Sequence, residues 1–211
     1  MEKNNFKKIL TYAIFYGSLW GITEATLGHV LHYFPVPISG FIMFPIALFF
    51  MQRAYRSSKS NKVFLLMGLT AALIKLVDIF IPGLPVIKTL NPMIAIMLEA
   101  SSVTVLSFLL NSNNVKQIFI GSAAACFFWR VIFVISSLII DKNTGAEIAF
   151  VNYPEKIISF IILNGIVSSF IAFALILIER KIKFQVDSKM KMRTSYSLVL
   201  FISAALIQFI I

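Results

Sequence analysis

The chain has 211 residues, of which 59% are hydrophobic and 13% are charged, and its mean hydropathy is +0.89. This composition excludes a soluble globular protein, because several apolar runs reach the roughly 17 to 25 residues that cross a bilayer. The net charge of +10 does not indicate a nucleic-acid partner, since the basic residues lie in short connections between apolar runs. We therefore expect an all-α, polytopic transmembrane helix bundle.

The first apolar segment, Ile9 to Leu31, combines small residues with a carboxyl group. Small residues recur at every fourth position: Ala13, Gly17, Gly21 and Ala25. At 3.6 residues per turn, Glu24 falls on the same arc of this helix as these small residues. A small face lets another helix approach closely, and a carboxyl group in hydrocarbon needs a partner or water. We expect this helix to face inward, against a helix of this chain or of a partner subunit.

Further apolar segments follow at about residues 40–54, 63–81, 92–110, 115–140, 157–178 and 195–211. The Pro- and Gly-rich link from Pro82 to Asn91 is predicted to be irregular and to dip into the membrane, and polar residues 111–114 are predicted to form a turn. The resulting organisation is a six-helix substrate-binding core at 1–180, a basic cytoplasmic linker at 181–194 and an additional transmembrane helix at 195–211.

The distribution of basic residues predicts the orientation. Of the 19 Lys and Arg residues, 14 fall on the side of the N-terminus, three fall on the opposite side, and two lie within spans. Cytoplasmic connections carry the excess of positive charge. This pattern predicts a multi-pass protein of the plasma membrane, with the N-terminus in the cytoplasm and, for seven spans, the C-terminus outside.

Five charged residues interrupt the apolar segments: Glu24, Lys75, Asp78, Glu99 and Arg130. Each would cost about 2.5 to 3.5 kcal/mol at the centre of an isolated span, so pairing or a hydrated cavity is expected. With a rise of about 1.5 Å per residue, all five lie on the outer side of their span midpoints. Lys75 and Asp78 can pair along one helix, and the other three are expected to make contacts between helices.

These residues have two interpretations: a solute site, or ion pairs that only hold helices together. Trp20 and Trp129 lie beside charged positions, where a flat ring suits either a heterocyclic ligand or ordinary packing. The predicted substrate-binding residues are Trp20, Glu24, Lys75, Asp78, Asn91, Glu99, Trp129 and Arg130. His29 and His32 lack the neighbouring cysteine or carboxylates of a metal site, and Cys126 is expected to serve packing, so we predict no metal.

Several catalytic signatures are absent. The sequence has no GxxxxGK[ST], HExxH or GxSxG motif, so it has neither a phosphate-binding loop for nucleotide hydrolysis nor a common hydrolase site. We expect a protein that is not an enzyme and that has no cofactor. Any ATP-driven step would need partner subunits.

The combined features resemble the substrate-binding S components of energy-coupling factor (ECF) transporters. The resemblance rests on six apolar helices, the ladder at 13, 17, 21 and 25, the proline-containing connection at 33–40, and polar residues gathered toward the outside. It implies a vitamin-like solute bound from outside, a lid formed by that connection, and a first helix docked on a transmembrane coupling protein driven by cytoplasmic ATPases. Glycines at two ladder positions and a seventh span depart from the pattern.

The leading hypothesis is therefore a membrane-embedded solute-binding subunit of a micronutrient uptake transporter, with a pocket open to the outside. Its partners would be a small-molecule solute, membrane lipid, a coupling protein and ATPases. One alternative is an intramembrane enzyme acting on a lipid or lipid-linked substrate, with Glu24 or Glu99 as acid or base. Another is a membrane scaffold subunit.

Overall fold

The computed structural model describes residues 2–31, 39–145, 148, 152–182 and 194–210, and every regular element among them is helical. The long helices are α1 (Glu2–Thr23), α3 (Ser39–Ser58), α4 (Lys62–Lys75), α5 (Val86–Val105), α7 (Val115–Thr144), α9 (Asn164–Lys181) and α10 (Thr194–Ile210). The short ones are α2 (His29–Leu31), α6 (Ser107–Leu110), α8 (Pro154–Ile158), the π-helical η1 (Glu24–Gly28) and η3 (Ser159–Leu163), and the 3₁₀ helix η2 (Leu76–Phe80). The predicted all-α class is confirmed.

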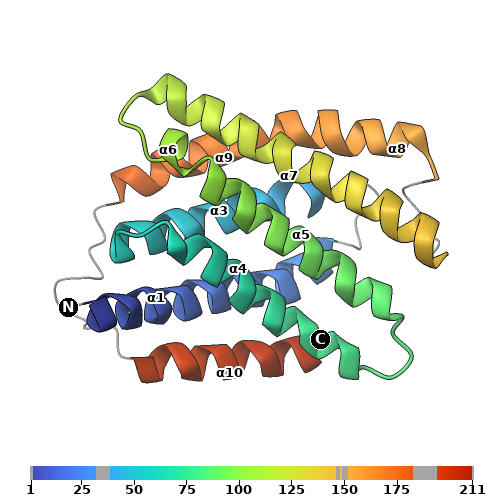
Figure 1. The fold of residues 1–211 in the computed structure, drawn as a ribbon, viewed down its shortest axis with the longest axis horizontal. Coiled ribbons are helices and arrows are strands. Elements are labelled where there is room, and N and C mark those ends of the chain that lie inside the picture. Colours follow the sequence, from blue (N-terminus) through green and yellow to red (C-terminus); the bar gives the residue numbers. More distant parts are fainter. Residues whose placement is uncertain (1, 32–38, 146–147, 149–151, 183–193, 211) are drawn as a thin grey trace.

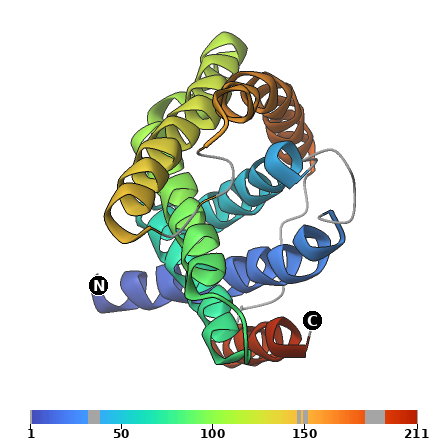
Figure 2. The same ribbon diagram turned by 90° about the vertical axis from the view of Figure 1, so that its right-hand side faces the viewer.

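Six of the long helices form a closed ring. The order of contact around it is α1, α4, α5, α7, α9, α3 and back to α1 (Figures 1 and 2). The core fills the inside of this ring, and its largest fully buried apolar side chains include Trp20, Phe44, Leu48, Phe64, Leu110 and Ile176. Helix α10 lies outside the ring and packs along α1 and α4.

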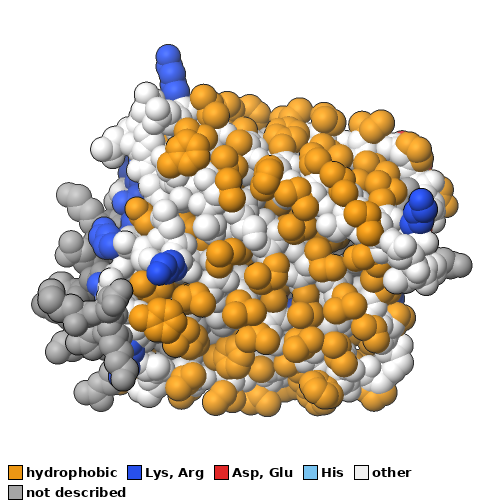
Figure 3. Space-filling model, viewed as in Figure 1, with side chains coloured by type: hydrophobic (Ala, Val, Ile, Leu, Met, Phe, Trp, Pro, Cys, Tyr) orange, Lys and Arg blue, Asp and Glu red, His pale blue; other side chains and the backbone are white. Residues whose placement is uncertain are grey.

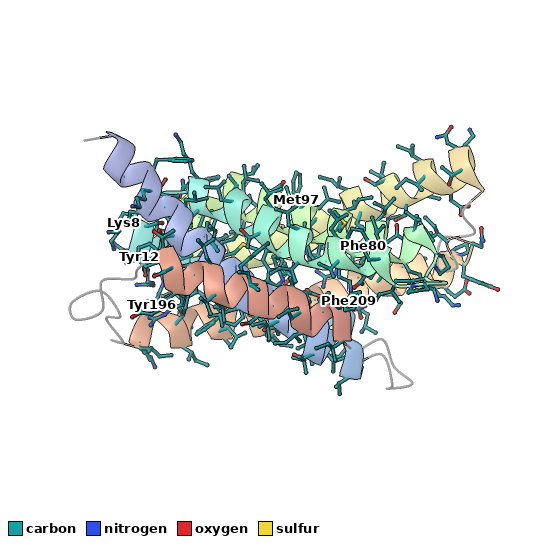
Figure 4. The ribbon with its side chains drawn as sticks, turned by 90° about the horizontal axis from the view of Figure 1, so that it is seen from below. Lys8, Tyr12, Phe80, Met97, Tyr196 and Phe209 are labelled. Atoms are coloured by element: carbon teal, nitrogen blue, oxygen red, sulfur yellow. The ribbon has the colours of Figure 1, made fainter. Side chains whose placement is uncertain are left out.

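Successive long helices run in opposite directions, and α10 runs parallel to α1 (Figures 1 and 4). The start of α1, the end of α3, the turn between α6 and α7, the end of α9 and the start of α10 therefore lie at one end of the bundle. These are the connections that carry most of the basic residues. We call this end of the molecule the basic end.

Among the described residues, four helical segments are long and apolar enough to cross a membrane: Lys62–Phe80, Val86–Val105, Val115–Thr144 and Pro154–Lys181. Large apolar side chains are exposed on the outside of the bundle, such as Phe80, Phe108, Ile139 and Phe209, and Figure 3 shows them spread over a broad face. A soluble monomer rarely exposes apolar patches of this extent, whereas lipid covers them without penalty. The bundle therefore has the surface of a membrane protein.

The predicted irregular link before the fourth span is partly wrong. Helix α5 begins at Val86, six residues before the expected start at Pro92. Pro85 precedes its first residue with φ −59° and ψ 133°, a geometry that suits a helix start. Pro92 then lies in the second turn, where its missing N–H removes one helix hydrogen bond. The expected break in the chain is confined to Ile81–Pro85.

The predicted turn at residues 111–114 is confirmed. Helix α6 ends at Leu110 and α7 begins at Val115. The side chain of Asn114 accepts a hydrogen bond of 2.9 Å from the backbone N–H of Lys116, and this cap satisfies one of the free donors at the start of α7. The opposite end of α7 stops at Gly145, whose φ of 63° is the left-handed conformation that glycine adopts readily.

Candidate functional site

Four consecutive members of the ring place five charged side chains in one region: Glu24 from η1, Lys75 from α4, Asp78 from η2, Glu99 from α5 and Arg130 from α7. Glu24 interacts electrostatically with Lys75 and Glu99, and Glu99 in turn with Arg130. We call these five residues the polar cluster. Apart from Lys75 and Asp78, which are three residues apart, the members of the cluster are distant in sequence, so the packing order of the helices brings them together.

Lys75 and Asp78 form the predicted pair. Lys75 Nζ lies 2.8 Å from Asp78 Oδ2, and the Asp78 residue is 5% exposed. The second carboxylate oxygen accepts a hydrogen bond of 2.6 Å from Gln208 Nε2 on α10. The contact from Gln208 was not foreseen, because an isolated glutamine near the end of the last apolar segment carries no sequence signal.

Glu24 is held by its own helix. Trp20 is fully buried, and its Nε1 donates a hydrogen bond of 3.2 Å to Glu24 Oε1 one turn later. The backbone changes to π-helical geometry at Glu24, and such single π turns within α-helices frequently occur at functional sites. The other carboxylate oxygen, Oε2, lies 3.5 Å from the place where a Cβ on Gly28 would stand.

Arg130 ties three helices together. It is fully buried; its Nη1 donates to the carbonyl of Cys126 and its Nη2 donates to Ser168 Oγ, each at 2.6 Å. Ser168 Oγ donates onward to the carbonyl of Phe41 on α3, at 2.9 Å. Among the described side chains, no ion pair within 4.0 Å joins Arg130 to Glu24 or Glu99. Arg130 thus contacts another helix through Ser168, and it interacts with Glu99 electrostatically.

Aromatic rings from three elements enclose one side of Arg130. The ring centroid of Trp129 lies 5.7 Å from that of Phe160 on η3 and 5.9 Å from that of Phe44 on α3. Phe133 completes this group, and the guanidinium carbon of Arg130 lies 4.6 Å from the Trp129 ring centroid. A planar cation beside an aromatic face is favourable. Of these rings only Trp129 was predicted, since phenylalanines in apolar segments give no distinguishing pattern.

Several polar atoms of this region are buried without a hydrogen-bond partner, among them Glu99 Oε2, Trp129 Nε1 and Gln208 Oε1. An unsatisfied buried polar group is rare in folded proteins and calls for an explanation. Asn91 Oδ1 is also buried and unsatisfied. No hydrogen bond or ion pair between described residues joins Asn91 to the polar cluster.

The small-residue ladder packs within the chain at its two glycines. A Cβ on Gly17 would stand 2.7 Å from Thr70 Cβ, and a Cβ on Gly21 would stand 2.6 Å from Ile74 Cδ1, both on α4. Ala13 and Ala25 are 0% and 3% exposed. The close approach of α1 and α4 requires these small residues. The ladder is therefore a helix-packing face, and its two glycines are not open to a partner subunit.

The structure says less about the predicted lid and the two histidines. Residues 32–38, which include His32 and the prolines of the first connection, lie outside the described residues, and His29 is the first residue of α2. Within the described part of the chain, no group of three His, Cys, Asp or Glu side chains could hold a metal ion. The buried Cys126 is a free thiol on the inner face of α7.

The fold and this buried region define a class: an all-helical bundle with membrane-compatible helices and a polar cluster between them. Comparison with protein-family models, with curated proteins and with solved structures finds no match.

Proposed function

We propose that this protein is a membrane-embedded solute-binding subunit of an uptake transporter, and that the polar cluster with its aromatic group is the solute site. The observation that carries the proposal is that two buried atoms without a hydrogen-bond partner, Trp129 Nε1 and Glu99 Oε2, belong to residues that each interact with Arg130. A carboxylate, an indole N–H and a guanidinium together offer an acceptor, a donor and a charge to one ligand.

The chemistry of the region favours a small ring-containing solute. Ligand sites are mostly apolar with a few polar groups that fix orientation, and Phe44, Trp129 and Phe160 beside Glu99 and Arg130 fit this description. A flat ring can stack on the aromatic faces, while its polar substituents reach the two charged groups. We propose a heterocyclic, vitamin-like micronutrient as the solute class.

The membrane arrangement belongs to the same proposal. We propose that α1, α3 and α10 also cross the bilayer, which gives six core spans and a seventh. The excess of Lys and Arg at the basic end would then place that end in the cytoplasm, and the polar cluster in the outer half. A reporter fused after Lys62 should read cytoplasmic and one inserted near Thr144 external; a cytoplasmic reading at Thr144 would contradict this orientation.

Partner subunits complete the proposal. The sequence has no nucleotide-binding motif, so uptake against a gradient would need separate ATPases and a coupling protein, as in the ECF transporters that the chain resembles. Gly17 and Gly21 face α4, so such a partner would dock elsewhere on the bundle.

The test is retention of a solute by the full chain. The protein is purified in mild detergent from its native membrane, and native mass spectrometry measures any small molecule that leaves with it. The variant Glu99→Gln keeps the shape of the side chain but removes its charge, and Glu155→Gln, at an exposed position on α8, is the matched control. We expect the bound mass in wild type and control, and its loss in Glu99→Gln. Equal retention by all three would rule out this site, and release of a chemically altered compound would favour the enzyme alternative.

A further inference from the structure

A second polar site lies at the basic end of the bundle, far along the helices from the polar cluster. Here the end of α3, the turn between α6 and α7 and the end of α9 come together around a pocket of about 320 Å³ (Figure 1). Figure 3 shows Lys and Arg side chains gathered at this edge of the molecule. The pocket is lined by Tyr55, Arg56, Lys59, Asn111, Asn113 and Arg180.

Among the described residues, the pocket wall carries three positive charges and no acid. Glu179, which interacts electrostatically with Arg180, is 1% exposed and is not among the residues that line the pocket. It already pairs with Arg56, Nε to Oε2 at 2.6 Å, and with Arg53, Nη1 to Oε1 at 3.6 Å. Arg180 and Arg56 repel each other electrostatically. The wall therefore keeps an excess of positive charge that a bound anion would neutralise.

The basic groups of the wall retain donors for a ligand. Arg56 uses Nε for Glu179, which leaves its two Nη atoms for another acceptor. Arg180 donates Nη2 to the carbonyl of Leu110 at 2.9 Å, and its Nε is buried without a hydrogen-bond partner. The amides of Asn111 and Asn113 add neutral donors. A tetrahedral oxyanion is bound in proteins by this combination of guanidinium, ammonium and amide groups.

Lys59 occupies an unusual backbone position for its residue type. Its φ is 58°, and it is the one described residue other than glycine with a positive φ. Its backbone N–H donates to the carbonyl of Tyr55 at 2.7 Å, which ends α3 in the manner usually served by glycine or asparagine. A lysine here costs roughly 1 kcal/mol of backbone strain relative to glycine. Its exposed side chain lies on the pocket wall, so contact with a ligand there would explain why a lysine occupies this strained position.

We propose that this pocket binds a phosphate group through Arg56, Lys59 and Arg180. The group comes either from an acidic phospholipid of the adjacent leaflet or from a soluble phosphate compound. Basic pockets between transmembrane helices are known to hold anionic lipid headgroups. The site is independent of the solute site, because it shares no residue with the polar cluster.

The experiment uses the purified full chain and two lysine variants. Lys59→Asn removes the charge while asparagine tolerates the left-handed backbone, and Lys62→Asn removes a neighbouring exposed lysine outside the wall. Native mass spectrometry titrates each protein with phosphatidylglycerol and with phosphatidylcholine, and thermal melting is measured with and without inorganic phosphate. The melting temperature of Lys59→Asn without ligand should equal or exceed that of wild type. Asn113→Ala is a second, exposed variant that leaves the charge unchanged.

A lipid source predicts tighter binding of phosphatidylglycerol than of phosphatidylcholine, weakened about tenfold by Lys59→Asn, since one charge-assisted hydrogen bond is worth this much. Lys62→Asn should have little effect and Asn113→Ala a smaller one. A soluble source predicts instead that inorganic phosphate raises the melting temperature of wild type and Lys62→Asn, but not of Lys59→Asn, without any lipid preference. The proposal is overturned if neither probe binds selectively, or if both lysine variants lose binding equally.

Discussion

Two buried carboxylates, one at the basic end and one near the centre of the bundle, have very different surroundings. Glu179, 1% exposed, pairs with Arg53 and Arg56 at the basic end. Each carboxylate has one oxygen without a hydrogen-bond partner, but Glu99, 5% exposed, also has no ion pair within 4.0 Å among the described residues. Burial of a charge is tolerated when partners compensate it, as at Glu179. The ion pairs therefore account for the burial of Glu179, whereas the burial of Glu99 needs another explanation.

The same contrast separates Arg130 from Arg56. Arg130 is fully buried, and its hydrogen bonds to Cys126 and Ser168 hold α7 against α9 and, through Phe41, against α3. The Arg56 side chain is 40% exposed, so water shares its charge. Changes at the centre of the bundle should therefore have larger effects on stability than changes at the basic end.

The largest effect is expected for Arg130→Met. Methionine is of similar length but apolar, so Ser168 loses its donor and Glu99 loses the nearest cation of α7. Removal of one partner from a buried charged group costs about 3 to 5 kcal/mol. Thermal unfolding in detergent measures the loss, with Lys116→Met, at an exposed position of the same helix, as control. An unchanged melting temperature would show that Arg130 does not hold the three helices together.

A smaller loss is expected for Glu179→Gln. Arg53 and Arg56 lose their anion, yet both side chains retain some access to solvent, 14% and 40%. We expect about 1 to 3 kcal/mol of destabilisation, less than for Arg130→Met, because water replaces part of the interaction. The same unfolding measurement tests it. A loss as large as that of Arg130→Met would show that changes at the basic end affect stability as much as changes at the centre of the bundle.

Ser168→Ala should cost about 1 to 2 kcal/mol, since it removes one hydrogen bond from Arg130 and one to the carbonyl of Phe41. Ser122→Ala on α7 is the control, because the hydroxyl of Ser122, equally buried, donates within its own helix to the carbonyl of Ile118. Comparison of the two melting temperatures isolates the bridge between helices. Equal losses would show that the bridge to α3 adds nothing.

The smallest effect on stability is expected for Glu99→Gln, within about 0.5 kcal/mol of wild type. The isosteric amide removes the cost of burying a charge and the repulsion from Glu24, which favours the variant, and also removes the attraction to Arg130, which opposes it. Solute retention, in contrast, should be lost. A strongly destabilised variant would make Glu99 a structural residue like Glu179, and would remove the main support for the solute site.

Much of the fold follows from local features of the sequence. Apolar runs of spanning length predict the helices, and the turn at 111–114 ends two of them as expected because Asn114 caps α7. The Lys75–Asp78 pair was also predicted, since three residues of helix bring the two side chains onto one face. The start of α5 was not predicted correctly. A proline inside the first turns of a helix cannot be distinguished in sequence from a proline that precedes the helix.

The sequence by itself determined that the chain is helical, apolar on its outside and carries buried charges in several helices, because these properties depend on residue type and period alone. Only the tertiary structure decided which helix lies beside which. It placed α4 against Gly17 and Gly21, and it put Phe44 and Phe160 around Trp129. The physical reason is that contacts between helices depend on their order around the ring, and apolar surfaces of similar pattern can pack in many orders.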